Sequence, residues 1–156
     1  MRKTAAILIA GFVAGAVDLL GALASYTSKG ATVDGILKYI ATGLVGPSAM
    51  QGGAGMVALG LACHFGLTIL MAAAFVAASL KISDLTRRPW LWGTVYGVIT
   101  WAVMVYVAVP MSGVPGWKLP QGWDIVSGLL AHIFYVGVPI AFIAQWGLRE
   151  PGYRAG

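Results

Sequence analysis

Four long apolar segments limit most strongly what this chain can fold into. They lie at about residues 4–26, 54–80, 90–109 and 124–147, and a helix needs about 20 residues to cross a bilayer. Only 10% of the 156 residues are charged and 59% are hydrophobic, whereas soluble domains carry roughly 25% charged residues. The sequence therefore predicts one integral membrane domain over residues 1–156, an all-α bundle of four transmembrane helices.

A short helix is expected between the first two spans, at about residues 35–46. Asp34 can cap this helix, because a carboxylate at the N-cap accepts hydrogen bonds from free amides of the first turn. Four apolar side chains then fall on one stripe: Ile36, Leu37, Ile40 and Leu44. This pattern is typical of a helix in the membrane interface, or of one packed across the mouth of a bundle.

The basic residues predict the orientation of the spans. With the N-terminus inside, seven of the ten are cytoplasmic and three are outside: Arg2, Lys3, Lys81, Arg87, Arg88, Arg149 and Arg154 against Lys29, Lys38 and Lys118. This distribution follows the positive-inside rule and predicts that both termini are cytoplasmic. One alternative is a cleaved signal peptide, since Ala22-Leu23-Ala24 resembles a cleavage site, but Asp18 interrupts the apolar run before it.

The partner expected from the composition is the lipid bilayer. The net charge of +5 does not indicate nucleic acid, because the basic residues form short clusters between apolar spans. A second copy of the chain or another membrane protein is a further candidate partner. Walker loops, G-x-S-x-G elbows and H-E-x-x-H motifs are all missing from the sequence. We therefore expect a protein that is not an enzyme.

Small residues indicate where the helices pack. Lipid provides no hydrophobic drive between helices, so glycine marks positions where two backbones approach closely. The expected packing positions are Gly11, Gly15, Gly60, Gly93, Gly97 and Gly128. In the fourth span, Pro139 cannot donate a hydrogen bond to the carbonyl of Tyr135, and we expect it to bend the helix there.

Asp18 and the only two histidines lie in the interior of the predicted spans. His64 and His132 each stand four residues after a glycine that is followed by leucine. At 1.5 Å per residue, Asp18, His64 and His132 lie about 12 to 16 Å from the outer ends of their helices. We expect them to form a polar cluster at one depth, with Tyr106 and Tyr135 as hydroxyl partners. Ionisable groups at membrane depth are costly, so this cluster is the candidate functional site.

Several interpretations of the cluster stay open. The preferred one is structural: the polar groups bond each other or carbonyls, and the chain is a non-enzymatic accessory component of the membrane, with no cofactor. The second is a small transporter or channel for protons or a small solute, because histidine titrates near neutral pH. A conducting site needs a wet path to the outer face, whereas a structural cluster is sealed and fully bonded.

Two further interpretations involve a bound metal. Haem b is one, with His64 and His132 as axial ligands, because their helices run in the same direction and can clamp a haem in a bundle. The other is a metal ion held by Asp18, His64 and His132, although no two of these residues have the spacing of a helix-borne site.

Short motifs in the last hundred residues suggest a relationship to a known family. They are His64 before an apolar span, Arg88-Pro89-Trp90, Gly93 with Gly97, Pro110-Met111-Ser112-Gly113, and Gly128 with His132. In these features the chain from about Leu59 onward resembles the YagU-like family of small bacterial inner-membrane proteins. The resemblance implies an inner-membrane location and a bundle in which both histidine positions recur. It implies no cofactor and no catalytic residue.

Overall fold

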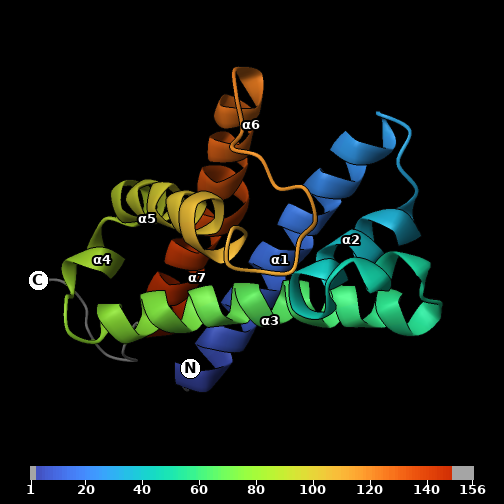
Figure 1. Cartoon of the computed structure of the whole chain (residues 1–156). Coiled ribbons are helices and arrows are strands. Elements are labelled where there is room, and N and C mark those ends of the chain that lie inside the picture. Colours follow the sequence, from blue (N-terminus) through green and yellow to red (C-terminus); the bar gives the residue numbers. More distant parts are fainter. Residues whose placement is uncertain (1–2, 149–156) are drawn as a thin grey trace, which may run out of the picture.

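The computed structural model describes residues 3–148 as an assembly of helices (Figure 1). Four of these are long and apolar enough to cross a membrane: Lys3–Thr27, Ala54–Ser79, Pro89–Ala108 and Trp123–Leu148. Each end of these four helices lies one residue or less from its predicted position. No strand occurs within the described range. The predicted all-α class with four membrane-length helices is therefore confirmed. Arg2, Arg149 and Arg154, which contribute to the predicted orientation, lie outside the described residues.

Two of the four spans contain a π-helical segment. The first and second spans are the continuous helices α1 (Lys3–Thr27) and α3 (Ala54–Ser79). The third consists of α5 (Pro89–Val103) and the π-helix η2 (Met104–Ala108). The fourth consists of α6 (Trp123–Ala131), the π-helix η3 (His132–Gly137) and α7 (Val138–Leu148).

A proline follows each π-helical segment by two residues, Pro110 after η2 and Pro139 after η3. Proline has no amide hydrogen to donate, and the helix adapts by widening just before it. The amide of Val138 donates to the carbonyl of Ile133, five residues earlier, instead of the usual four. The local irregularity expected at Pro139 is thus present as a π-helical segment.

The loop between α1 and α3 contains α2 (Val33–Val45) and the short helix η1 (Pro47–Gln51). Asp34 does not cap α2. Thr32 is the N-cap, and its hydroxyl accepts a hydrogen bond from the amide of Gly35 at 3.2 Å, so α2 begins two residues earlier than expected. Asp34 lies in the first turn and pairs with Lys38 at 2.9 Å. The hydrogen bond from Lys38 lowers the pKa of the Asp34 carboxyl.

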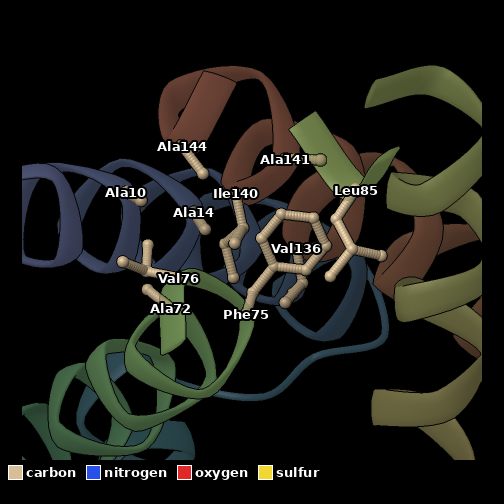
Figure 2. Packing of buried hydrophobic residues seen from close by; sticks show 10 residues of the cluster. All are labelled: Ala10, Ala14, Ala72, Phe75, Val76, Leu85, Val136, Ile140, Ala141 and Ala144. Carbon is tan, nitrogen blue, oxygen red and sulfur yellow. The ribbon is translucent and has the colours of Figure 1, made fainter. Parts of the chain in front are cut away.

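The largest buried cluster lies where α1, α3 and α7 meet, beside the short helix α4 (Asp84–Arg87). Figure 2 shows its side chains: Ala10, Ala14, Ala72, Phe75, Val76, Leu85, Val136, Ile140, Ala141 and Ala144. Five of the ten are alanines, and small side chains let membrane helices approach closely. This tight packing anchors the half of the bundle that lies near the beginning of α1 and the end of α7.

Tyr96 on α5 joins that helix to α3. Its hydroxyl donates to the carbonyl of Met71 at 2.7 Å, and its ring packs edge-on against Phe75. We expect Tyr96→Phe to lower the free energy of unfolding by about 0.6 to 2 kcal/mol, the usual worth of a hydrogen bond between membrane helices. Unfolding by SDS, followed by circular dichroism, measures this change. Tyr106→Phe is the control, because Tyr106 is exposed, and equal stability of the two variants would contradict the expectation.

Candidate functional site

All six predicted packing glycines lie against a neighbouring element. A Cβ added at Gly11 of α1 would lie 2.5 Å from the Cα of Ile69 in α3, and one at Gly97 of α5 would lie 2.5 Å from the Cα of Ile133 in η3. A Cβ at Gly15, Gly60 or Gly93 would likewise come within 3.0 Å of a neighbouring element, and one at Gly128 would lie 3.1 Å from the Trp101 side chain. These contacts hold α1 on α3 and α5 on η3. The same contacts fix how far each helix is shifted along its neighbour, and so the level at which the polar side chains lie.

His64 of α3 is hydrogen-bonded to the backbone of α1. Its Nε2 lies 2.9 Å from the carbonyl oxygen of Gly15. A carbonyl can only accept, so Nε2 carries the hydrogen and donates, and Nδ1 of the neutral ring remains an acceptor. The ring also packs edge-on against Phe65. His64 therefore links two transmembrane helices while keeping one nitrogen available for a proton.

His132 is the first residue of the π-helical segment η3. Its Nδ1 lies 3.0 Å from the carbonyl oxygen of Gly128, one turn earlier in the same span. By the same reasoning Nδ1 donates, and Nε2 remains an acceptor. π-helical segments within α-helices are frequent at functional sites. The ring is held in place by its own helix and not by another one.

Asp18 lies in the second half of α1 and lines a cavity of about 490 Å³ together with His132 and Tyr135. We call this space the Asp18 cavity. It lies between α1 and the α6–η3 part of the fourth span, and the end of α1 and the start of α6 point to the same side of the molecule (Figure 1). The structure thus places Asp18 and His132 in one cavity. His64 bonds the carbonyl of Gly15, three residues before Asp18, but does not line this cavity.

A second cavity of about 430 Å³ adjoins the first and faces the loop between the third and fourth spans. The two share the lining residues Ser25, Tyr26, Ser127, Gly128 and His132. The second cavity, here called the loop cavity, is also lined by Lys29, Lys118 and Asp124. His132 therefore stands between a charged region near the helix ends and the Asp18 carboxylate.

His64 lines a third cavity, of about 530 Å³, whose lining is largely apolar. This separation does not fit haem ligation, because the two imidazoles do not face one common space and Nε2 of His64 is already bonded to Gly15. A metal ion on Asp18, His64 and His132 is not supported either. Within residues 3–148, no three His, Cys, Asp or Glu side chains are grouped closely enough to hold one.

Tyr106 is not part of the cluster, although it was expected to partner an imidazole. Its side chain is 58% exposed and contacts Trp101 edge-on, with 6.0 Å between ring centroids. Met104, two residues earlier, lines both the loop cavity and the third cavity. Two residues along a helix turn a side chain by about 200°, so Tyr106 points away from these spaces. Tyr135, in contrast, lies over Gly21 of α1 and lines the Asp18 cavity.

Several lining residues of the Asp18 cavity were not predicted as site residues. They are Tyr26, Trp123, Ser127 and Phe134. Trp123 and Tyr26 stand near helix ends, where aromatic residues commonly mark the membrane interface, so their pattern does not by itself indicate a cavity. Ser25 could be predicted as a neighbour of Asp18, because it lies seven residues later and so on the same helical face.

Comparisons with known proteins do not assign the chain to a family. No family model matches it, and no curated protein or solved structure matches it either. The resemblance to the YagU-like family stays a prediction. The function is therefore inferred from the geometry of the site.

Proposed function

We propose that this chain is a small multi-pass transporter of the bacterial inner membrane, which binds and releases protons at Asp18 and the two imidazoles. The observation that carries the proposal is that Asp18 and His132 line one cavity. The sequence favoured a sealed packing cluster, but a sealed cluster needs every polar group bonded. Asp18 instead lines a cavity of about 490 Å³, which supports the transporter interpretation over the structural one.

The chemistry of the cluster suits proton exchange. An ionised carboxylate at membrane depth is costly, so a proton or another cation has to neutralise it. His64 and His132 each use one ring nitrogen to bond a carbonyl, and each neutral ring keeps a second nitrogen that accepts a proton. The second ring nitrogen of His132, which shares the cavity with Asp18, can take a proton from the carboxyl group and return it.

The proposed orientation puts the cavities on the outer side of the membrane. Lys3, Lys81, Arg87 and Arg88 belong to the inner side under the positive-inside rule. Lys29 and Lys118, which line the loop cavity, belong to the outer side. In this arrangement both termini are cytoplasmic, and protons reach Asp18 from the outer aqueous phase through the loop cavity.

A second candidate is an accessory membrane component or homo-oligomer. The observation in its favour is that α6 buries none of its nine residues, although it belongs to a span that is apolar enough to lie in the bilayer. The surface of α6 is thus left to lipid or to a neighbouring membrane protein. This candidate requires no exchange of protons at Asp18.

Labelling with dicyclohexylcarbodiimide tests the proposal. This lipid-soluble reagent adds to protonated carboxyl groups, and Asp18 is the only carboxylate residue in the interior of a predicted span, since Asp124 stands at the first position of the fourth. In right-side-out membrane vesicles we expect peptide mass spectrometry to detect one adduct on Asp18, formed more slowly as the outer pH rises. Asp34→Asn should label normally and Asp18→Asn should not label. An unmodified Asp18, or a rate independent of outer pH, would contradict proton exchange with the outside.

A further inference from the structure

The lining of the Asp18 cavity has a distinctive combination of groups. Asp18 is its only carboxylate residue, and it contains no lysine or arginine. Four aromatic side chains complete it: Tyr26, Trp123, Phe134 and Tyr135. The basic residues of this end of the molecule, Lys29 and Lys118, line the adjoining loop cavity instead. The Asp18 cavity therefore has one negative charge surrounded by aromatic rings.

This combination selects for a positive charge on an apolar body. The faces of aromatic rings attract cations, and cages of such rings recognise quaternary ammonium groups. A carboxylate in a region of low dielectric constant attracts a cation strongly and repels an anion. The volume of about 490 Å³ lies within the roughly 300 to 1,000 Å³ of small-molecule sites. A small polar neutral solute would leave most of the aromatic lining without a suitable partner.

One ring of the cavity already contacts a cation of the chain itself. The ammonium group of Lys29 lies 5.6 Å from the centre of the Tyr26 ring, within the distance of a cation–π interaction. Tyr26 belongs to the walls of both the Asp18 cavity and the loop cavity. The aromatic wall is therefore accessible to a positive group that comes from the loop cavity.

We propose that the Asp18 cavity binds a lipophilic organic cation, such as a hydrophobic amine, quaternary ammonium or phosphonium ion, in competition with a proton on Asp18. The inference rests on the proposed function and names its substrate class. One carboxylate balances either the proton or the cation, so binding of the cation releases the proton. The titratable groups that share the cavity with Asp18 are Tyr26 on α1, and His132 and Tyr135 on η3. His64 on α3 lines another cavity.

Binding of tetraphenylphosphonium to the purified full-length protein in dodecyl maltoside tests this inference. Isothermal titration calorimetry should give a dissociation constant that falls as the pH is raised, because fewer protons then compete with the cation for Asp18. Tetraphenylborate has the same shape and the opposite charge, and it should not compete. Asp18→Asn should weaken binding of tetraphenylphosphonium at least about tenfold, because a lost ion pair in a desolvated site costs more than 1.4 kcal/mol.

Matched variants separate the carboxylate from effects on folding. Asp34→Asn removes an exposed acid that lies outside the cavity and should leave the dissociation constant unchanged. Asp18→Glu keeps the charge and should retain most of the affinity. Trp123→Leu should weaken binding several-fold, because it removes one aromatic ring from the wall while the exposed position tolerates the change. Size-exclusion profiles and helical circular dichroism show that each variant is folded.

The outcomes distinguish this inference from the proposed function. Equal affinity of the wild type and Asp18→Asn for tetraphenylphosphonium, or equal affinity of the wild type for the phosphonium and the borate, would overturn the cation site. If carbodiimide still labels Asp18 and tetraphenylphosphonium gives no protection, the proton site stands and its ligand is not an organic cation. If Asp18 is not labelled at all, the proposed function itself fails. Protection of Asp18 by the phosphonium, but not by the borate, supports both.

Discussion

Replacing Asp18 by asparagine should lower proton movement across liposome membranes by about 100-fold, the lower range of what a positioned acid–base group contributes to proton transfer. Asparagine keeps the size of the side chain but cannot take up a proton at membrane depth. The measurement uses the reconstituted protein, an internal pH-sensitive dye and a potassium diffusion potential that draws protons inward. The initial rate of internal acidification is compared between variants at equal protein density.

The stability of Asp18→Asn should not fall, although its proton transport should. Burying an amide costs less than burying a carboxylate, so Asp18→Asn should unfold at the same SDS concentration as the wild type, or at a higher one. Asp34→Asn, which removes an acid on α2 that lies outside both cavities, should retain the wild-type proton flux. If Asp18→Asn conducts as well as the wild type, the cluster does not carry protons. If it instead unfolds early, the role of Asp18 is structural.

Adding one methyl group at Gly97 should destabilise the fold by about 1 to 3 kcal/mol, the usual cost of overpacking. In Gly97→Ala the new Cβ would meet the backbone of η3, 2.5 Å from the Cα of Ile133 and 2.7 Å from the carbonyl oxygen of His132. Backbone atoms cannot rotate aside as a flexible side chain can. The helices α5 and η3 must therefore separate, and this moves His132 relative to Asp18. SDS unfolding followed by circular dichroism measures the loss.

Gly66→Ala is the matched control for this substitution. Gly66 also lies within a transmembrane helix, but nothing stands within 4 Å of a Cβ built on it. Alanine favours the helical state over glycine by roughly 0.8 to 1 kcal/mol, so this variant should be as stable as the wild type or more so. The two variants thus make the same chemical change, but Gly97→Ala should lower the stability and Gly66→Ala should maintain or raise it. Equal stability of both would show that the contact at Gly97 is not close in the protein.

The parts of the fold that could be predicted from the sequence depend on local composition. The ends of the four spans follow from the length of apolar runs, because lipid cannot hydrogen-bond to an exposed backbone. The packing glycines follow from helical periodicity. The N-cap of α2 was wrong by two residues, since Thr32 and Asp34 are both suitable capping residues. Only the geometry at Thr32, with extended backbone dihedral angles, decides between them.

The candidate site could be predicted only in part. Equal depth along two helices was enough to place Asp18 near His132, because rise per residue is constant in a helix, but His64 lines a different cavity. Which side chains share a cavity could not be predicted, because this depends on how far α6 stands from the second half of α1. The π-helical segments were not predicted either. Pro110 and Pro139 mark their positions, but whether a helix bends or widens before a proline depends on its neighbours.

The π-helical segment η3 divides the fourth span into two parts with different tolerance to substitution. α7 buries five residues, Val138, Ile140, Ala141, Ala144 and Gly147, and a larger side chain at any of them must displace another helix. α6 buries none, so its outward positions accept side chains of many sizes. The single wide turn between them carries one extra residue, which rotates the residues of α6 relative to those of α7 by about 100°. Deleting one residue within 132–137 would restore a regular helix and turn the whole of α6, so that the chain would keep its core while presenting a different set of side chains to Asp18.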